Sequence, residues 1–562
     1  MAAKTPAIVI LGPGSLATAR RIQQRYPDAL IHGLAGRVEG DRQYLEFGAT
    51  MRELYQQDTP IIALCAAGIV IRTLAPLLLE KGAEPPVLAV AEDGSAVVPL
   101  LGGLGGVNVM AREIAQTLHV APAITTSGEL RFGTCLLNPP SGYSLGDLEQ
   151  GKRFVSDLLA GESVRIEGAA PWLDQAQLPE DEQARLAIRI DSAAGTPAAD
   201  ELRIYPRNVV VAISAGATPA IGETLREAGL AVQSLACLLA ADSDMARAEL
   251  HEAASALNVP LRFAPVVGDV GQWLNEALVQ PRSIRTLGAH AVAVTEQPLD
   301  PRQVGRLRGR LAVIGLGPGA AELMVPAVRA ELDRATDVLG YETYVRMAGP
   351  FRGDQVQHCT DNREEMQRAR HAFELAAQGR SVVVVSSGDP GVFAMAAAVL
   401  EALHESTDAQ WHAVDLQILP GVSASLATAA QAGAPLGHDF CVMSLSDNLK
   451  PWSIIEKRLD LAAEADLALA FYNPISRSRP WQLGRALEIV AHHRTAQTPV
   501  VLGRDIGRPG QTLRVTTLGQ LTPDQVDMRT MVLIGSSTTC VFPRAEGGDW
   551  VYTPRWYGSK PL

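Results

Sequence analysis

Leu311-Ala-Val-Ile-Gly-Leu-Gly-Pro-Gly319 is a short apolar run that ends in a glycine-rich turn, and this pairing decides the fold class of the chain. The same pairing returns at Val383-Val-Val-Ser-Ser-Gly-Asp-Pro-Gly391 and at Leu416-Gln-Ile-Leu-Pro-Gly-Val-Ser-Ala424. The four consecutive valines at 382–385 are typical of a strand that is buried on both faces of a parallel sheet. In an open parallel sheet, turns of this kind lie at the carboxyl ends of the strands, where ligands bind. We therefore expect an α/β fold with a ligand site at these turns.

Three more apolar runs in the same part of the chain have this character, at residues 467–471, 499–502 and 531–534. Each is followed by a turn of small or polar residues, at 472–474, 503–507 and 535–538. Because the carboxyl ends of parallel strands share one edge of a sheet, we expect all of these turns to converge. Any single turn is explained equally well as a tight connection between a strand and a helix, and it is their number that favours a binding site.

Strand, turn and helix patterns also alternate upstream of residue 310, which predicts several small α/β domains. A chain of 562 residues is too long for a single core. From about residue 138 the pattern decays into proline, glycine, alanine and acidic residues. We therefore divide this part into a domain at 1–140, a compressed middle region or linker at 141–207, a domain at 208–297 and a linker at 298–310.

The composition excludes several classes of function. With 49 Lys and Arg against 61 Asp and Glu, the net charge of −12 argues against a nucleic-acid or anionic-membrane partner. The six cysteines are scattered and form no CxxC pair, so we expect neither a zinc site nor an iron–sulfur cluster, and no metal ligands. We find no signal peptide and no apolar run of membrane-spanning length, and we expect a cytoplasmic protein.

A dinucleotide is the first ligand to consider, because Gly315, Gly317 and Ala320 match the G-x-G-x-x-A fingerprint. Pro318, however, lacks the amide donor that a pyrophosphate would need, and Glu322 adds negative charge at the same place. No G-x-x-x-x-G-K-[ST] loop for a nucleoside triphosphate is present either. A cofactor without phosphates, such as S-adenosylmethionine (SAM), suits these loops better.

The glycine turns belong to a longer set of motifs between residues 310 and 555. Besides the three turns, the set comprises Gly340-Tyr-Glu-Thr-Tyr344, Asp361-Asn-Arg-Glu-Glu365, Pro435-Leu-Gly-His-Asp-Phe440, Leu445-Ser-Asp-Asn-Leu-Lys-Pro-Trp452 and Phe471-Tyr-Asn-Pro474. This combination resembles the tetrapyrrole methylases and, more narrowly, the precorrin-3B C(17)-methyltransferases of cobalamin (vitamin B12) biosynthesis. The resemblance implies two α/β lobes, at 311–434 and 435–562, with SAM bound between them.

The resemblance also implies which residues lie beside the cofactor. These candidates are Pro318, Gly388, Asp389, Val392, Phe393, Ser423, Ala424, Tyr472 and Gly535. Asp389 has a second interpretation, as a turn residue whose side chain bonds to its own backbone.

The implied reaction is methylation of C17 of precorrin-3B, or of its cobalt form, with contraction of the macrocycle to precorrin-4. Methyl transfer mainly requires an aligned carbon nucleophile, whereas contraction also requires a base and a hydrogen-bond donor. The catalytic candidates are Asp447 and Lys450, for which a solvated surface pair is the alternative. Methylation of another precorrin carbon is the alternative reaction.

A precorrin carries many carboxylates, so an acidic protein must bring cations to it locally. The substrate-binding candidates are Tyr341, Tyr344, Arg477, Arg479 and Arg504, with Arg508 in the same turn as Arg504. A solvated loop charge is the alternative interpretation of each arginine.

The front half carries motifs of another kind. These are Gly68-Ile-Val-Ile-Arg-Thr-Leu-Ala-Pro76, Leu100-Leu-Gly-Gly-Leu-Gly-Gly-Val-Asn108, Ala111-Arg-Glu-Ile114 and Ile124-Thr-Thr-Ser127. They resemble the amino-terminal part of cobalt-precorrin-5A hydrolases, which open a ring lactone and release acetaldehyde, and residues 208–295 resemble the carboxyl domain of that family. The family's glycine loop contains a histidine that this shorter loop lacks. A hydrolase and a non-catalytic corrinoid-binding module are therefore both open for the front half.

Two further expectations concern partners. Related methylases imply a homodimer, and a fusion of two parts of one pathway favours contact with other cobalamin-pathway enzymes.

Overall fold

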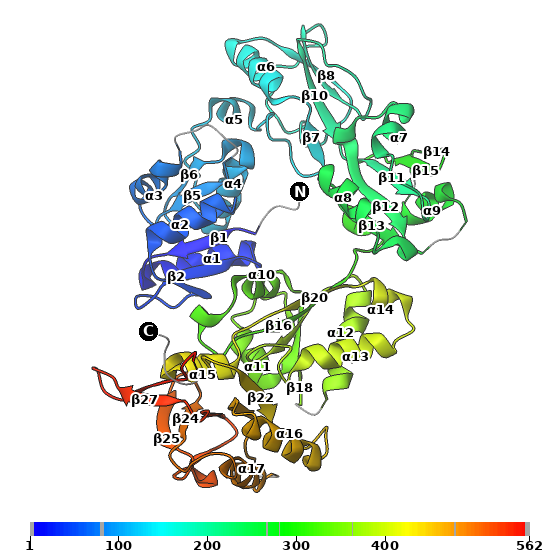
Figure 1. Ribbon diagram of the computed structural model, residues 1–562. Coiled ribbons are helices and arrows are strands. Elements are labelled where there is room, and N and C mark those ends of the chain that lie inside the picture. Colours follow the sequence, from blue (N-terminus) through cyan, green and yellow to red (C-terminus); the bar gives the residue numbers. More distant parts are fainter. Residues whose placement is uncertain are drawn as a thin grey trace. The chain divides into compact units, whose positions relative to one another are not determined.

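The computed structural model describes residues 5–78, 84–265, 268–279, 281–361, 364–476 and 479–556. The chain divides into two compact units, each built of α/β layers (Figure 1). The first unit extends to residue 309 and includes Pro350–Gln355 and Ala377–Gly379, and the second contains the remainder. Within the described ranges, no helix is long and apolar enough to cross a bilayer.

The first unit opens with a doubly wound sheet of order β3-β2-β1-β4-β5-β6. Its strands are β1 (Ala7–Ile10), β2 (Leu30–Leu34), β3 (Arg42–Tyr44), β4 (Ile61–Leu64), β5 (Val87–Val90) and the antiparallel β6 (Val97–Leu101). Its helices are α1 (Leu16–Arg25), α2 (Phe47–Gln56), α3 (Ala67–Leu74), α4 (Val107–Leu118) and α5 (Ser127–Phe132). α3 ends at Leu74, because Pro76 cannot continue the helical hydrogen bonds. Residues 79–83 lie outside the described residues.

The region expected to be a compressed linker is a folded module, so that prediction is wrong. Its sheet has the order β7-β10-β9-β8 and carries α6 (Leu148–Ala160). The strands are β7 (Tyr143–Leu145), β8 (Val164–Glu167), β9 (Leu186–Ile190) and β10 (Glu201–Pro206). Phe154 and Leu158 of α6 are buried against Ile188 and Ile204 of the sheet. Short strands between long polar loops concealed this core in the sequence.

A third module follows, with the order β13-β12-β11-β15-β14. Its elements are β11 (Val209–Ile213), α7 (Ile221–Ala228), β12 (Leu235–Ala241), α8 (Ala248–Ala256), β13 (Leu261–Ala264), α9 (Val270–Ala277), β14 (Ser283–Leu287) and β15 (His290–Val294). Part of the expected linker at 298–310 packs on this module. Val304 is fully buried, and the backbones of Arg306 and Phe263 exchange two hydrogen bonds of 2.8 Å.

The second unit begins with lobe 1, the all-parallel sheet β18-β17-β19-β16-β20 and its helices. Its strands are β16 (Arg310–Gly315), β17 (Asp337–Tyr341), β18 (Val356–Thr360), β19 (Ser381–Ser386) and β20 (Asp415–Leu419). Its helices are α10 (Pro326–Arg334), α11 (Glu342–Ala348), α12 (Glu365–Ala377), α13 (Met395–Glu405) and α14 (Ala409–Ala413). β16 lies between β19 and β20, so the three glycine turns leave neighbouring strands at one edge of the sheet.

Lobe 2 is the mixed sheet β22-β23-β26-β24-β25 with its helices. Its strands are β22 (Phe440–Ser444), β23 (Ala468–Tyr472), β24 (Pro499–Arg504), β25 (Thr512–Thr517) and β26 (Thr530–Ile534), and its helices are α15 (Ala424–Ala432), α16 (Trp452–Glu464) and α17 (Gln482–Ala491). A small sheet of order β21-β28-β27 adds β21 (Gly433–Ala434), β27 (Cys540–Pro543) and β28 (Asp549–Tyr552). α15 packs on this lobe through Ala429 and Ala432, so the chain leaves lobe 1 before α15 and not at residue 434.

Candidate active site between the two lobes

The three glycine turns of lobe 1 meet through their backbones. Gly317 and Gly388 exchange two backbone hydrogen bonds, of 3.1 and 2.7 Å. A Cβ atom on Gly315 or on Gly421 would overlap with the carbonyl oxygen of Gly388. Only glycine allows the backbones of these three turns to approach so closely. The expected convergence of these turns is therefore confirmed.

Asp389 fastens two of the turns together. Its Oδ1 accepts a hydrogen bond of 2.8 Å from the amide of Gly391, the local bond that the turn interpretation requires. Its Oδ2 accepts a bond of 3.1 Å from the amide of Gly421, in the next turn. Both carboxylate oxygens therefore hold backbone, and the side chain determines the relative position of the two turns.

Tyr472 links lobe 2 to the third turn. It lies at the carboxyl end of β23, and its hydroxyl oxygen accepts a hydrogen bond of 3.1 Å from the amide of Ser425. Ser423 begins α15 as its N-cap, and its hydroxyl is 3.1 Å from that of Ser425. Ala424, between them, is the first residue of the helix. These residues thus form one contiguous group.

Phe393 is held in a strained conformation over this group. Its φ of 53° lies in the left-handed region, which is an outlier for an aromatic residue. Half of the side chain is exposed, and its ring centroid is 5.4 Å from that of Tyr472. Lys450 Nζ is 5.8 Å from the same ring centroid. Val392 precedes Phe393 in this turn, and its amide donates to the Asp389 carbonyl at 3.3 Å.

The two catalytic candidates have different surroundings. Burial, together with the charge of Arg458, lowers the pKa of Lys450 below its usual value. The Asp447 carboxylate accepts a hydrogen bond of 3.2 Å from Nε2 of the buried Gln482. Both residues are described, and no ion pair joins them. The two side chains therefore do not neutralise each other, and their catalytic role stays a prediction.

The substrate candidates fall into separate groups. Tyr341 and Tyr344, at the end of β17, pack edge to face with ring centroids 5.4 Å apart, and burial raises the pKa of Tyr344. Arg479 is 8% exposed and donates to the Asn473 carbonyl oxygen at 3.2 Å. Arg504 is ion-paired with Asp505 and Asp527 at 2.9 and 2.8 Å. Arg477 lies outside the described residues.

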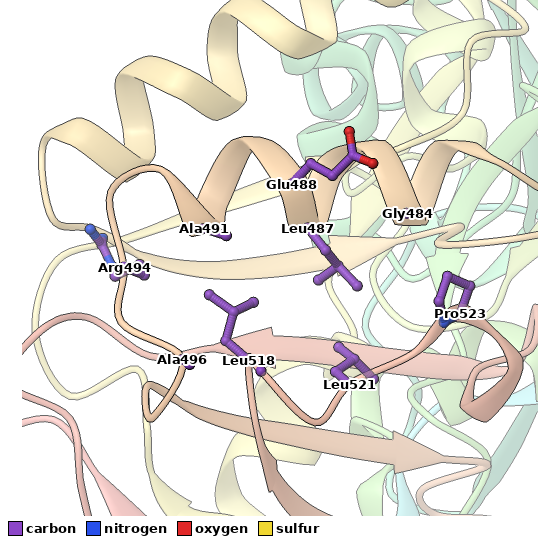
Figure 2. Close-up of a pocket in the computed structure, with 10 residues that line it drawn as sticks. Gly484, Leu487, Glu488, Ala491, Arg494, Ala496, Leu518, Leu521 and Pro523 are labelled. Atoms are coloured by element: carbon purple, nitrogen blue, oxygen red, sulfur yellow. The ribbon is translucent and has the colours of Figure 1, made fainter.

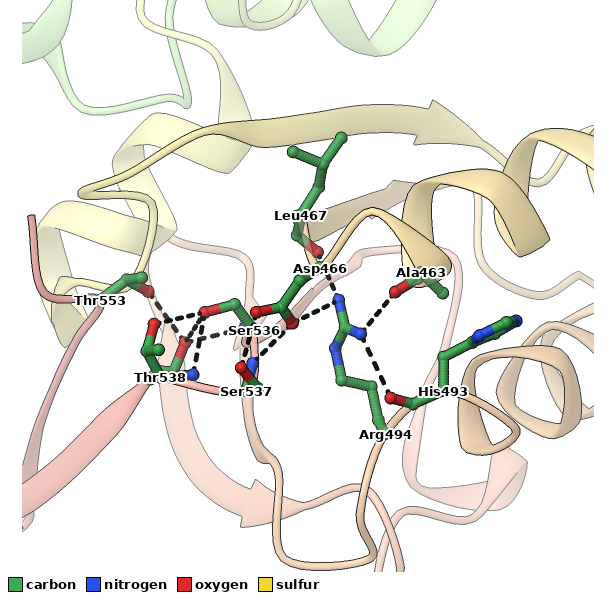
Figure 3. A network of polar contacts seen from close by, with 10 residues as sticks. Ala463, Asp466, Leu467, His493, Arg494, Ser536, Ser537, Thr538 and Thr553 are labelled. Carbon is green, nitrogen blue, oxygen red and sulfur yellow. Dashed lines mark hydrogen bonds and ion pairs between the residues drawn. The ribbon is translucent and has the colours of Figure 1, made fainter. Parts of the chain in front are cut away.

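The turn at 535–538 does not join the others, and the expectation that it would was wrong. β26 is antiparallel to both β23 and β24, so Gly535 lies at the opposite edge of the sheet, bonded to the carbonyl oxygen of Pro499. The polar groups of this turn have structural partners (Figure 3). The Asp466 carboxylate accepts from the amide and hydroxyl of Ser537 at 2.8 and 2.6 Å, and it pairs with the buried Arg494 at 3.1 Å. Strand direction, which periodicity does not reveal, caused the error.

A cavity of about 420 Å³ in lobe 2 lies at that same distant edge, between α17 and the segments on either side of β24 and β25 (Figure 2). Its walls are mainly apolar, with Leu487, Leu518 and Leu521. It therefore offers none of the groups that the interlobe site brings together.

Two features of the front half concern its predicted motifs. Asn108, which follows the glycine loop, donates to the buried Glu129 at 2.6 Å, and Arg112 pairs with the same carboxylate at 2.5 Å. A separate cavity of about 350 Å³, lined by Ser15, Cys65 and Glu92 among others, lies where β1, β4 and β5 end. Burial raises the pKa of the Cys65 thiol to about 11, so it is neutral at pH 7. Among the described residues, no group of three or more His, Cys, Asp and Glu is placed to hold a metal ion.

Two residues of the site, Gly421 and Ser425, were not predicted from sequence. Gly421 lies within the Pro-Gly-Val-Ser-Ala motif, and Ser425 follows it directly. The signal for Gly421 was its place directly after the strand. Ser425 gave no signal, because its role depends on Tyr472, which is 47 residues away.

Comparison with known proteins identifies both parts of the chain. Residues 310–522 match the family model "Tetrapyrrole (Corrin/Porphyrin) Methylases", and residues 49–129 match "Cobalamin synthesis G N-terminal". A precorrin-3B C(17)-methyltransferase from Sinorhizobium sp. is 50% identical over 251 residues, which cover 45% of this chain and 98% of the relative. A probable cobalt-factor III C(17)-methyltransferase from Salmonella typhimurium is 42% identical over 44% of this chain and 99% of the relative. The cobalamin biosynthesis protein CobIJ from Mycobacterium bovis is 47% identical over 46% of this chain, and only 50% of that relative is covered.

These matches confirm the two predicted resemblances, a methyltransferase in the back half and a cobalamin-synthesis region in the front half. Two relatives are more than 40% identical and are covered almost entirely. The chain belongs to the tetrapyrrole methylase family.

Proposed function

We propose that this chain transfers a methyl group from SAM to C17 of precorrin-3B, or of its cobalt counterpart, with contraction of the macrocycle to precorrin-4. The observation that carries the proposal is the meeting of three glycine turns beside Tyr472 and Phe393, in a region of 251 residues that is 50% identical to a relative named for this reaction. Relatives named for precorrin-3B and for cobalt-factor III are both close, so both forms of the substrate must be tested.

The chemistry of the turns suits SAM better than a phosphate-bearing cofactor. A Cβ atom at Gly315 or Gly421 would overlap with backbone atoms, and Gly388 has a positive φ of 69°, so these turns carry no side chains and a ligand can approach main-chain amides and carbonyls. The Asp389 carboxylate beside these turns would repel a phosphate. SAM supplies an electrophilic methyl group, and the residues of this chain bind and orient it. Gly535 has no part in this assignment.

Each contact of the site has a role in the proposal. Pro318, Gly388 and Asp389 shape the floor on which SAM lies, while Ser423, Ala424 and Tyr472 form the wall that comes from lobe 2. Val392 and the ring of Phe393, whose backbone is strained, cover the group and so exclude water from the methyl group. Since methyl transfer needs alignment above all, these positioning contacts supply most of the rate acceleration.

Contraction of the ring needs proton transfer, which we assign to Asp447 and Lys450. Asp447, oriented by Gln482, accepts the proton of a substrate hydroxyl. Lys450, whose pKa burial lowers, donates a hydrogen bond or a proton to the oxygen on which charge develops. Arg479 is our first choice for a substrate carboxylate. Arg504 contributes less, because two carboxylates already neutralise it.

Incubation with SAM and either metal-free precorrin-3B or its cobalt form, without oxygen and followed by NMR of the product carbon skeleton, tests the proposal. A ring-contracted, C17-methylated product from one substrate is the expected result, and it also answers the metal question. Tight binding of SAM with methylation at another carbon would overturn the reaction but leave the cofactor assignment intact.

For the front half we propose a corrinoid-holding module without hydrolase activity. The glycine loop lacks the histidine of the hydrolases, and its nearby polar groups, Asn108, Arg112 and Glu129, satisfy one another. The neutral Cys65 thiol is a poor nucleophile. The full chain should therefore release no acetaldehyde from cobalt-precorrin-5A while still binding it, and acetaldehyde above the enzyme-free rate would restore the hydrolase assignment.

We also propose that the chain forms a homodimer through the β27–β28 hairpin. β27 is the edge strand of its sheet, and the hairpin exposes Val541, Phe542, Trp550 and Tyr552. An apolar edge strand of this kind invites pairing with a second copy.

A further inference from the structure

We propose that Arg508 is a positioning residue through which lobe 2 holds two of the cofactor turns of lobe 1 in register. The inference rests on the proposed use of SAM, and it gives Arg508, which the sequence placed among the arginines for substrate carboxylates, a role on the cofactor side instead.

Arg508 lies in a tight and well-braced turn between β24 and β25. Its amide donates to the carbonyl oxygen of Asp505 at 2.9 Å, and the amide of Gly507 donates to Oε1 of Gln511 at 2.8 Å. Asp505 and Gly507 both have positive φ, of 52° and 80°. The turn therefore presents the Arg508 side chain from a fixed base.

The guanidinium group reaches two different turns of the other lobe. Its Nε donates to the carbonyl oxygen of Pro318 at 2.9 Å, in the turn that follows β16. Its Nη2 donates to Oγ of Ser387 at 3.0 Å, in the turn that follows β19. One side chain therefore ties together the ends of two adjacent strands.

The backbones on either side approach closely around these bonds. A Cβ atom on Gly319, whose φ is 135°, would lie 2.6 Å from Cγ of Arg508. A Cβ atom on Gly507 would lie 2.9 Å from Cγ of Pro318. Glycine on both sides is thus required for the arginine to reach its acceptors.

The charge of Arg508 distinguishes it from its neighbour. Arg504 bonds to the carboxylates of Asp505 and Asp527, within its own lobe. No carboxylate among the described residues pairs with Arg508, whose hydrogen-bond acceptors are neutral. Charge-assisted bonds to neutral acceptors are strong, and the rigid fork of arginine is suited to hold two of them at once.

The consequence concerns cofactor affinity. Asp389 fixes the turn at 386–391 against Gly421, and Arg508 fixes the same turn against Pro318 from the other side. Without Arg508 these turns must be ordered by the ligand itself, and that cost reduces the affinity for SAM.

The test measures SAM binding to the full chain by isothermal titration calorimetry. We expect Arg508→Ala to raise the Kd for SAM about 10- to 100-fold, and Arg508→Lys to recover only part of the loss because an ammonium lacks the fork. Arg485→Ala is the matched control and should change the Kd less than about twofold, since its ion-pair partners, Glu456 and Glu488, lie in its own lobe. Ser387→Ala should raise the Kd by a smaller factor, and its effect should vanish in the Arg508→Ala background.

The outcomes separate this inference from the proposed function. If the wild-type chain binds SAM and Arg508→Ala binds it as tightly as Arg485→Ala does, the inference is overturned and the proposed function stands. A lower melting temperature with unchanged Kd in Arg508→Ala would mean a structural role alone and would also overturn it. If the wild-type chain fails to bind SAM, the proposed function is wrong and this inference falls with it. Should Arg508→Ala not fold, Arg508→Lys decides the question, and the effect of Ser387→Ala is then measured in the Arg508→Lys background.

Discussion

At the scale of single residues, the Asp389 carboxylate makes both a local bond within its own turn and a bond to a second turn of the candidate site. Its Oδ1 makes the bond to residue i+2 that many aspartates make in turns, and its Oδ2 makes the bond to Gly421 that few can make. The structure contains the local bond that the turn interpretation requires, whereas the bond to Gly421 was not predicted, and a role of Asp389 beside the cofactor stays a prediction.

Asp389→Asn should therefore weaken SAM binding roughly tenfold, because an amide cannot accept from two backbone N–H groups in the same geometry. Asp408→Asn is the matched control, since Asp408 accepts the same local bond, from Gln410 at 2.8 Å, and holds no second turn among the residues that the structure describes. Calorimetric titration of both variants with SAM compares them. Equal affinity in the two variants would refute a role for the cross-turn bond.

Lys450 gives the site a predicted pH dependence. If its ammonium form is the one that acts in ring contraction, activity falls as the pH rises through its pKa. Burial and Arg458 both lower that pKa, so the alkaline fall should begin below the pH expected for an ordinary lysine.

Arg458→Gln removes the second of these causes and should shift the alkaline fall to higher pH, measured as kcat against pH for the contracted product. Lys450→Met should remove the fall together with most of the contraction, by roughly 100-fold or more. An alkaline fall that stays at the same pH in Arg458→Gln would exclude Lys450 as its source.

At the scale of elements, strands were predicted most accurately from sequence where they are buried on both faces of the sheet. β16 and β19 are continuous apolar runs, and their glycine turns follow immediately, so both the strands and the site between them could be found. Two strands, β18 with the sequence Val-Gln-His-Cys-Thr and β25 with Thr-Leu-Arg-Val-Thr-Thr, were not predicted. Their residues alternate between exposed and partly buried or are mostly exposed, so neither strand forms a continuous apolar run. The direction of β26 depends on which strands flank it, which is a property of the whole sheet.

The middle module is the clearest case of tertiary packing that the sequence did not reveal. Its helix α6 has a capping aspartate, Asp147, whose carboxylate accepts from the amide of Gln150 at 2.6 Å, and it buries Phe154 and Leu158.

Phe154→Ala should destabilise this module by about 3–5 kcal/mol, the cost of a large cavity in a core. Hydrogen exchange across residues 143–206 measures the effect on this module separately from the rest of the chain. Lys152→Ala, on the exposed face of the same helix, is the control and should leave exchange unchanged. Exchange in the Phe154→Ala variant as slow as in this control would mean that the module has no cooperative core.

At the scale of the whole molecule, two units of different origin share one chain. The back unit matches a methylase family over residues 310–522, whereas the front match is confined to residues 49–129 of a longer α/β unit. Function was therefore readable from sequence in the back half, where glycine turns constrain backbone directly. In the front half the informative residues, Asn108 and Glu129, are 21 residues apart in sequence and meet only in the fold.

The homodimer that we propose has its interface on the β27–β28 hairpin, near the end of the described residues. β27 is exposed along its whole length, and the guanidinium of Arg544 stacks 3.8 Å from the ring centroid of Trp550, which holds the aromatic face in place.

Because burial of Val541 and Phe542 against a second copy would remove apolar surface from water, Val541→Glu should oppose association by placing a charge in that interface. We expect the dimer dissociation constant to rise roughly tenfold or more, measured by analytical ultracentrifugation across a concentration series. Val279→Glu is the control, since Val279 is 91% exposed in the other unit and should leave association unchanged. A wild-type chain that sediments as a monomer throughout the series, or a Val541→Glu variant that dimerises as the wild type does, would rule out this hairpin as the interface.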